Sequence, residues 1–239
     1  MERQKQPLVS VIIPVYTRAH LLHACLLSIA AQTYRNTQVI VVNDGSPESD
    51  EVKRIVAQHP EIDRYIEQEN GGAPRARNRG FEVATGSYLL FCDADAVLEP
   101  TMIAQCMRAL DQHPEAAYSY CGMKFGWKTF AALPFDATRL RLFNYIHVSS
   151  LIRREAFPGF DPEIKRFQDW DVWLTMLEKG HRGVAVPDVL FTVATKGTMS
   201  KWLPSWFYRL FPWSKDVRAY RAAQQHIRTK HHLRVGSGS

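Results

Sequence analysis

Residues 9–31 read VSVIIPVYTRAHLLHACLLSIAA, and this stretch decides the fold class. Val9–Val15 is a short apolar run rich in β-branched residues, which is typical of a buried strand. In the segment that follows, Leu22, Leu26 and Ile29 recur at the spacing of one helical face. The stretch therefore predicts a strand, a short polar turn and a helix.

The same pattern recurs twice further along the chain. Val39–Asn43 (VIVVN) is a second apolar run, and a helix is predicted after it near Glu51–Gln58. A third run, Tyr88–Cys92 (YLLFC), follows a predicted helix near Arg75–Ala84. Strands that are apolar on both faces and alternate with helices indicate a mainly parallel sheet, whose ligands bind at the carboxyl ends of the strands.

The pattern becomes less regular after Thr101, where we expect a second lobe to begin. Helices are predicted from Thr101 to about Gln112 and over Asp169–Lys179. Strands are predicted over the ranges Ala117–Cys121, Arg182–Val186 and Val189–Val193.

Composition limits the class of protein. The chain has 239 residues, of which 46% are hydrophobic and 23% charged, so it is long enough to bury a sizeable core. No apolar run approaches the length of a membrane-spanning helix, and the start MERQKQP lacks the apolar stretch of a secretory signal. We therefore expect a cytoplasmic protein.

The cysteines and the net charge limit the possible partners. Four cysteines lie in separate segments without C-x-x-C spacing, which argues against a zinc site and a disulfide framework. The formal net charge of +6 leaves nucleic acid, an anionic membrane surface and phosphorylated ligands as candidate partners.

Polar residues follow each of the three predicted parallel strands. They are Tyr16-Thr17-Arg18, Asp44-Gly45-Ser46 and Asp93-Ala94-Asp95. Any one of these could simply end a strand or cap a helix, but three at one sheet edge predict a site. Asp93 and Asp95 are carboxylates one residue apart, a pattern that suits a hard divalent cation such as Mg²⁺ or Mn²⁺ bridging diphosphate oxygens.

Two further segments supply candidates for holding a nucleotide. Asp44 can accept a hydrogen bond from a base N–H, although Asp-Gly is also a common turn. Asn70-Gly71-Gly72 leads into a predicted helix carrying Arg77 and Asn78, where N–H groups and a guanidinium could face phosphates. Arg75 and Arg79 are expected on its solvated face.

Five blocks in this order resemble the family 2 glycosyltransferases over roughly residues 8–195. The blocks read VSVIIPVYTR, VIVVNDGS, ENGGAPRARNRG, LLFCDADA and PGFDPEIKRFQDWDVWLTMLEKG. The resemblance implies an α/β GT-A fold, with a mainly parallel Rossmann-like nucleotide-binding sheet fused to an acceptor-binding lobe. It places one GT-A domain over residues 1–200, divided into a nucleotide-sugar-binding half (8–96) and an acceptor-binding half (97–200).

The resemblance also assigns functions to individual residues. It implies that the donor is held by the residues Pro14, Tyr16, Asp44, Asn70, Arg77, Asp93 and Ala94, with Asp44 as partner of the base. It implies Mn²⁺ or Mg²⁺ on Asp93 and Asp95. The family's late acidic pair reads Gln168-Asp169 here, and its second member, Asp169, is the implied catalytic base.

Three positions depart from the family pattern or stay open. Thr17 stands where Asn is usual, and Gln168 stands where Glu is usual, which removes a negative charge beside the base. Family members often supply another ligand for the metal or diphosphate after the last strands. The segment ATKGTMSK offers Lys196, Thr198 and Ser200 for that position.

The predicted activity is an inverting transfer of a sugar from a nucleotide diphosphate, with UDP expected, to a glycan or lipid-linked acceptor in bacterial surface polysaccharide or lipid-linked glycan synthesis. A base at the start of a helix would have its pKa lowered by the helix dipole, which burial could oppose. A catalytically silent sugar-nucleotide-binding protein and a nucleotidyltransferase are the alternatives. The latter would need a glycine-rich loop after the first strand, where this chain has PVYTR.

The predicted C-terminal arm, residues 201–234, differs in composition from the catalytic blocks. Its first part, KWLPSWFYRLFPW, is rich in aromatic residues, and its second part is basic. Such amphipathic composition suits an anionic membrane surface, so we hypothesise peripheral attachment to the inner face of the cell membrane. Packing against the acceptor lobe is the alternative, and nucleic acid is not expected as a partner. The last residues, 235–239, are expected to be a flexible tail.

Overall fold

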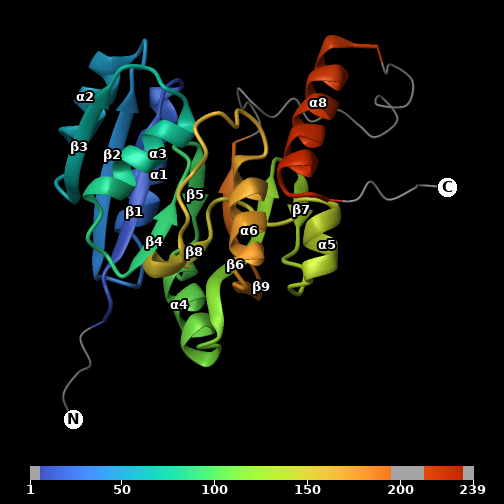
Figure 1. Ribbon diagram of the computed structural model, residues 1–239. Helices are drawn as coiled ribbons and strands as arrows, with labels where there is room; N and C mark the ends of the chain where they lie inside the picture. The colour runs from blue at the N-terminus through green and yellow to red at the C-terminus, as the bar shows by residue number, and fades with distance from the viewer. Residues whose placement is uncertain (1–5, 195–212, 234–239) are drawn as a thin grey trace.

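The computed structural model describes residues 6–194 and 213–233, which form one mixed sheet with helices on both faces (Figure 1). The strands are β1 (Val9–Val15), β2 (Thr37–Asp44), β3 (Ile62–Gln68), β4 (Tyr88–Phe91), β5 (Ala96–Leu98), β6 (Ala116–Phe125), β7 (Lys128–Phe130), β8 (Leu151–Arg153) and β9 (Arg182–Val193). The helices are α1 (Ala19–Ala30), α2 (Ser49–Val56), α3 (Ala73–Val83), α4 (Met102–Gln112), α5 (Ala137–Leu142), α6 (Gln168–Glu178) and α8 (Lys215–Lys230).

The sheet has a parallel half and a mixed half. Its strand order is β3-β2-β1-β4-β8-β6-β9-β5, with β7 paired to β6. Strands β1 to β4 are parallel, as predicted for β1, β2 and β4 from their apolar runs, whereas β3 was not predicted. Strand β8 runs antiparallel between β4 and β6, so backbone hydrogen bonds cross from one half to the other. The nucleotide-binding and acceptor-binding halves expected from the sequence therefore share one continuous sheet.

One predicted boundary is wrong. The sequence predicts two strands separated at Pro187-Asp188, but residues 182–193 form the single strand β9. Its pairing with β6 shifts register beside Cys121 and Gly122, so the Pro-Asp pair forms an irregularity in the strand and not a turn. The strand continues past the proline because a bulge tolerates the missing N–H.

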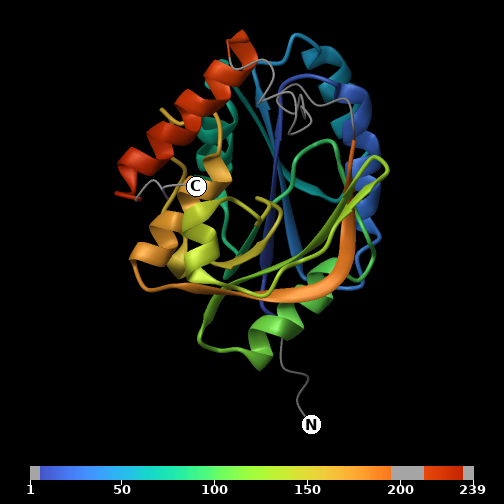
Figure 2. The same cartoon turned by 90° about the vertical axis from the view of Figure 1, so that its right-hand side faces the viewer.

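Two apolar clusters bind the helices to the sheet. One face of the parallel strands packs against α1, α2 and α4 through side chains such as Leu26 and Ile103. The other face packs against α3, α5, α6 and α8 through side chains such as Trp170, Trp173 and Ile227. Figure 2 shows the resulting layers, with α1 on one side of the sheet and α6 and α8 on the other.

The described part of the predicted C-terminal arm packs on the protein. Helix α8 places Val217 and Ile227 in buried positions, and its end is tied to α6 by ion pairs of Lys230 and His231 with Asp171. The aromatic segment 201–212 and the tail 235–239 lie outside the described residues. Within the described ranges, no helix combines the length and apolar character needed to cross a membrane.

Candidate active site

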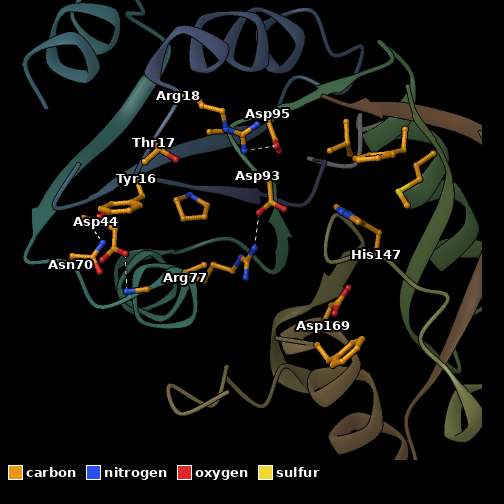
Figure 3. A pocket seen from close by; sticks show the side chains of 18 of the residues that line it. Tyr16, Thr17, Arg18, Asp44, Asn70, Arg77, Asp93, Asp95, His147 and Asp169 are labelled. Atoms are coloured by element: carbon orange, nitrogen blue, oxygen red, sulfur yellow. Dashed lines mark hydrogen bonds and ion pairs between the residues drawn. The ribbon is translucent and has the colours of Figure 1, made fainter. Parts of the chain in front are cut away.

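A cavity of about 740 Å³ opens at the carboxyl ends of β1, β2 and β4 (Figure 3). Its lining includes all the residues that the resemblance assigned to the donor, the cation or the catalytic base, namely Pro14, Tyr16, Asp44, Asn70, Arg77, Asp93, Ala94, Asp95 and Asp169. Residues that lie far apart in the sequence therefore converge on one space. The open candidates Lys196, Thr198 and Ser200 lie outside the described residues.

Asp44 holds the loop after β3 against the end of β2. Its Oδ1 accepts hydrogen bonds from Gly71 N and Gln68 Nε2, and its Oδ2 accepts one from Gly72 N, each at 2.8 Å. Gly45 makes this contact possible, because it adopts a φ of 64° and a Cβ there would lie 2.7 Å from Asn70 N. Asp44, which the resemblance assigns as partner of the nucleotide base, therefore also fixes the conformation of this loop. The sequence did not predict this second function.

The turn after β1 is held by a carboxylate from the neighbouring loop. Glu48 Oε1 accepts a hydrogen bond from Arg18 N at 3.2 Å, and Glu48 Oε2 accepts one from Ala19 N at 2.7 Å. Arg18 has a left-handed backbone conformation, with a φ of 62°, and is the N-cap residue of α1. Glu48 therefore satisfies N–H groups at the start of α1 and positions the Arg18 side chain at the cavity.

Each carboxylate of the Asp93-Ala94-Asp95 turn is paired with an arginine. Arg77 Nη2 lies 2.6 Å from Asp93 Oδ1, and Arg18 Nη2 lies 3.0 Å from Asp95 Oδ2. Burial would raise the pKa of Asp93, but the charges of Arg77, His147 and Arg18 outweigh burial and lower it. The pKa of Asp95 is raised by burial and by the charge of Asp93, against the opposing effect of Arg18.

Arg77 joins the end of β4 to the start of α6. Its Nη1 donates to Gln168 Oε1 at 2.7 Å, its Nη2 is bonded to Asp93, and its guanidinium lies 5.2 Å from the centroid of the Phe160 ring. Only its Nε is buried without a hydrogen-bond partner among the described residues. Each Nη carries a second N–H, and Arg77 lines the cavity, so the expectation that its guanidinium faces the donor phosphates stays a prediction.

Asn78, which follows Arg77 on α3, has a structural function. Its side-chain amide donates to Phe160 O at 2.8 Å and its Oδ1 accepts from Phe160 N at 2.9 Å. This paired bond fixes the loop before α6 to helix α3. Asn78 does not line the cavity.

Asp169 lies in the first turn of α6, which follows the left-handed residue Phe167 (φ 61°). Its Oδ1 accepts a hydrogen bond from Trp170 N at 2.9 Å. Burial raises the pKa of Asp169 above its usual range, against the lowering effects of His147, the Trp170 N–H, Asn144 and Arg77. Burial thus outweighs the groups that would make this carboxylate a weaker base.

The neighbouring acid, Asp171, faces away from the cavity. It is buried, and it accepts hydrogen bonds from His231 Nε2 at 2.8 Å and from Lys230 Nζ at 3.0 Å. These bonds tie α6 to the end of α8, so Asp171 has a structural function.

Sequence reasoning missed several residues that complete the cavity. His147, from the irregular segment before β8, lies near Asp93 and Asp169 (Figure 3), and Asn144 from the same segment lines the cavity and hydrogen-bonds Asp169. The Ser149 N–H donates to His147 Nδ1 at 3.1 Å, which fixes the orientation of the ring. The apolar part of the lining comes from the residues Met123, Phe125, Phe167 and Val193. No periodicity marks these residues in the sequence.

The carboxylate oxygens of Asp93 and Asp95 are suitable ligands for a divalent cation. Within the described ranges, no group of three or more His, Cys, Asp or Glu side chains is arranged to hold a metal by itself. Mg²⁺-type sites, however, commonly use one or two carboxylates and complete their coordination with water and substrate phosphates. Asp93 and Asp95 both line the cavity, so they could supply the two protein ligands of such a site.

Comparison with known proteins was made for both sequence and structure. The family model described as Glycosyl transferase family 2 matches residues 10–160. The chain is 37% identical over 135 residues to the uncharacterized glycosyltransferase YibD of Escherichia coli (strain K12), covering 54% of this chain and 39% of that protein. It is 38% identical over 185 residues to the uncharacterized glycosyltransferase RP339 of Rickettsia prowazekii (strain Madrid E), covering 70% of this chain and 58% of that protein. The chain therefore spans less than two thirds of the length of either relative.

The solved structures show the same architecture. TarS 1-349 from S. aureus in complex with UDP superposes with a TM-score of 0.68 at 20% identity, over 78% of this chain and 60% of that one. The mannosyltransferase PcManGT from Pyrobaculum calidifontis, in complex with GDP-Man and Mn²⁺, superposes with a TM-score of 0.66 at 22% identity, over 99% of this chain and 67% of that one. At these identities the likeness establishes the fold.

Proposed function

Because this chain belongs to glycosyl transferase family 2 and has the GT-A fold, we propose that it is an inverting transferase acting on a nucleotide diphosphate sugar. One observation carries the proposal. The paired carboxylates Asp93 and Asp95 and the lone carboxylate Asp169 line the same cavity but come from different elements. This arrangement suits a reaction in which the leaving diphosphate and the attacking hydroxyl are handled by separate groups.

The nucleotide end of the cavity is formed by residues from β1 and β2. Tyr16 exposes 47% of its surface at the cavity, which leaves a ring face available to a base. Asp44 Oδ2 accepts one hydrogen bond from the protein, so it retains capacity for a base N–H. TarS has been solved with UDP and with UDP-GlcNAc, and PcManGT with GDP-Man. We favour a UDP-sugar for this chain.

Asp93 and Asp95 would hold Mn²⁺ or Mg²⁺ together with the diphosphate. The metal-bound neighbour PcManGT supports this assignment. Such a cation supplies Lewis-acid stabilisation of the charge that develops on the leaving diphosphate. Arg77 keeps Asp93 ionised and oriented for that purpose through its bond to Oδ1.

Asp169 is the base of the proposed reaction. Its raised pKa brings it closer to the range in which a carboxylate removes a proton effectively, and the Trp170 N–H fixes its orientation. Of the other carboxylates that line the described cavity, Asp44 is bonded to backbone N–H groups, and Asp93 and Asp95 are paired with arginines. With one base and no separate nucleophile, the proposal is a single displacement that inverts the anomeric configuration.

The acceptor would enter beside the apolar lining. Met123, Phe125 and Val193 line this part of the cavity, and they suit the apolar face of a sugar ring. We extend the proposal to a glycan or lipid-linked acceptor, with the protein bound peripherally to the inner face of an anionic membrane. Support comes from composition, because residues 201–213 contain tryptophans between basic residues.

The decisive experiment uses a panel of UDP- and GDP-sugars with Mn²⁺ and measures release of the nucleotide with and without candidate acceptors. We expect turnover of one donor class, loss of turnover in EDTA, and a β-linked product by NMR when the donor is α-linked. Asp169→Asn should lose at least about a hundredfold in transfer while donor affinity persists, the usual scale for a general base. A product with retained configuration would overturn the single displacement, and full turnover in EDTA would overturn the metal site.

A further inference from the structure

The irregular segment before β8 places at the cavity a histidine that the proposed reaction does not use. His147 lines the cavity near Asp93 and Asp169 (Figure 3). We infer that His147 is a specificity residue, whose Nε2 hydrogen-bonds a hydroxyl group of the sugar that is transferred. This inference rests on the proposed function of the cavity, and it names the part of the donor that His147 recognises.

The backbone on both sides of His147 is fixed by the core. Ile146 is 1% exposed and Val148 is 5% exposed, and both belong to the apolar cluster that packs against α6. The carbonyl oxygen of Ile146 accepts a hydrogen bond from Trp173 Nε1 at 2.9 Å. The carbonyl oxygen of His147 accepts one from Ser150 Oγ at 2.7 Å. The Cα of His147 is therefore held in one position although the segment is neither helix nor strand.

The imidazole ring is also held, and one of its nitrogens stays available. The Ser149 N–H donates to Nδ1 at 3.1 Å, and the ring centroid lies 5.1 Å from that of Phe191 on β9. Within residues 6–194 and 213–233, Nε2 of His147 makes no hydrogen bond. A ring that is oriented before the ligand arrives loses little conformational entropy on binding, so a single hydrogen bond from it contributes usefully to affinity.

His147 lies close to the two carboxylates that the proposed reaction uses for different groups. It lowers the pKa of Asp93 and opposes the burial that raises the pKa of Asp169, so it is within electrostatic range of both. In the proposed single displacement, Asp93 serves the leaving diphosphate and Asp169 serves the attacking hydroxyl. The leaving and attacking groups are on opposite faces of the anomeric carbon, so the transferred sugar lies between them. A ring close to both carboxylates is therefore close to this sugar.

The chemistry of Nε2 suits a sugar hydroxyl. A hydroxyl group both donates and accepts hydrogen bonds, so it can pair with Nε2 whether or not that nitrogen carries a proton. The other polar side chain that this segment contributes to the cavity, Asn144, is already engaged, because its Oδ1 accepts the Ile146 N–H and its side chain bonds Asp169. A site that bonds one particular hydroxyl rejects sugars that lack it, because the protein group is then left unpaired.

The test compares the binding of a sugar nucleotide with that of the nucleotide alone. Calorimetry with the full chain and Mn²⁺, without acceptor, measures the affinities for UDP, UDP-GlcNAc, UDP-glucose, GDP and GDP-Man. His147→Phe keeps a ring against Phe191 but removes both ring nitrogens. His147→Gln keeps a polar group at about the reach of Nε2. The control is His113→Phe, which removes an exposed histidine that is paired with Glu115 and does not line the cavity.

We expect His147→Phe to bind the sugar nucleotide that the natural chain prefers about threefold to tenfold more weakly, the range for one hydrogen bond. Its affinity for the matching free nucleotide should stay within about twofold, because UDP and GDP carry no sugar beyond the diphosphate. His147→Gln should lie between His147→Phe and the natural chain, and His113→Phe should match the natural chain. A defect of the fold would weaken both kinds of ligand, so a loss confined to the sugar nucleotide is not expected from a purely structural function.

Failure of the inference differs from failure of the proposed function. If the natural chain binds none of these nucleotides and sugar nucleotides, the proposed function is wrong and the assignment of His147 falls with it. If the natural chain binds a donor but His147→Phe changes the affinities for the sugar nucleotide and the free nucleotide equally, the inference alone is overturned. It is also overturned if His147→Phe leaves donor affinity unchanged and raises only the KM for an acceptor.

Discussion

The attachment of α8 to α6 should depend on the protonation of His231. The imidazole is 2% exposed, with Nε2 at 2.8 Å from Asp171 and Nδ1 at 2.8 Å from Glu178. Burial alone would lower the pKa of His231, but the hydrogen bonds to the two carboxylates outweigh burial and raise it. Lys230, which also bonds Asp171 and Asp161, completes the charged groups around the ring.

The effect of His231→Ala can be worked from these contacts. A hydrogen bond between charged groups, as to the buried Asp171, contributes roughly 2 kcal/mol. The bond to Glu178, whose side chain is 53% exposed, contributes at most about 1 kcal/mol. The loss of about 3 kcal/mol corresponds to roughly a hundredfold increase in opening of α8, because each 1.4 kcal/mol is tenfold. His113→Ala, which removes an exposed histidine paired with Glu115, is the matched control.

The measurement is hydrogen exchange by mass spectrometry, comparing peptides from α8 with peptides from α3. The pKa of His231 is raised in the folded protein, so the stability that its ion pairs give to α8 is present in full below the unfolded pKa of about 6.5. That stability is lost as the pH rises through the pKa of the folded state. After correction for intrinsic rates, α8 of the natural chain should therefore be more protected near pH 6 than near pH 9. His231→Ala should lose both protection and pH dependence. Unchanged exchange of α8 in His231→Ala would refute the reasoning.

Three further predictions concern the site and the membrane. Gly45→Ala should weaken UDP binding, measured by calorimetry, at least about tenfold, because the new Cβ would lie 2.7 Å from the backbone nitrogen of Asn70. The control is Gly180→Ala, which is also at positive φ but has nothing within 4 Å of its Cβ position, and it should leave UDP binding unchanged. Arg77→Lys keeps the positive charge but loses one of the two bonds that Arg77 makes to Gln168 and Asp93, so the melting temperature of this variant should fall by roughly 4 to 8 °C. An unchanged melting temperature would mean that this bridge does not hold α3 to α6. Replacing Trp202 and Trp206 together by serine should reduce co-sedimentation of the full chain with anionic liposomes at least about threefold, whereas equal pelleting would remove the membrane hypothesis.

The parallel half of the sheet could be predicted because its strands are buried on both faces. Val9–Val15 and Val39–Asn43 are largely apolar, and each is followed by polar residues at one edge of the sheet. Strand β3 was not predicted, because it lies at the edge, and residues 62–68 read IDRYIEQ with exposed and half-buried positions. Tyr16, Asp44, Asp93 and Asp95 could be predicted for the same reason, since they follow strands that could be recognised, whereas Asp169 was assigned from the family resemblance.

The remaining site residues depend on contacts that sequence spacing does not encode. The pairing of Arg18 with Asp95 joins positions 77 residues apart, and it follows from a left-handed turn held by Glu48. His147 comes from an irregular segment whose position is set by β8, a strand of three residues. The direction of the pKa shift of Asp169 also required the structure, because burial, which opposes the helix dipole, cannot be read from its neighbours in the chain.

Under the proposed function, the continuity of the sheet affects how the donor is kept from water. Hydrogen bonds from β4 through β8 to β6 place one sheet under the proposed donor and acceptor positions, so the two halves of the described sheet are not joined by a hinge that could close over the cavity. We therefore expect side chains at the rim of the cavity, and the acceptor itself, to contribute to shielding the reacting carbon. Slow hydrolysis of the donor in the absence of acceptor is therefore an expected property, and its suppression by added compounds offers a way to search for the acceptor.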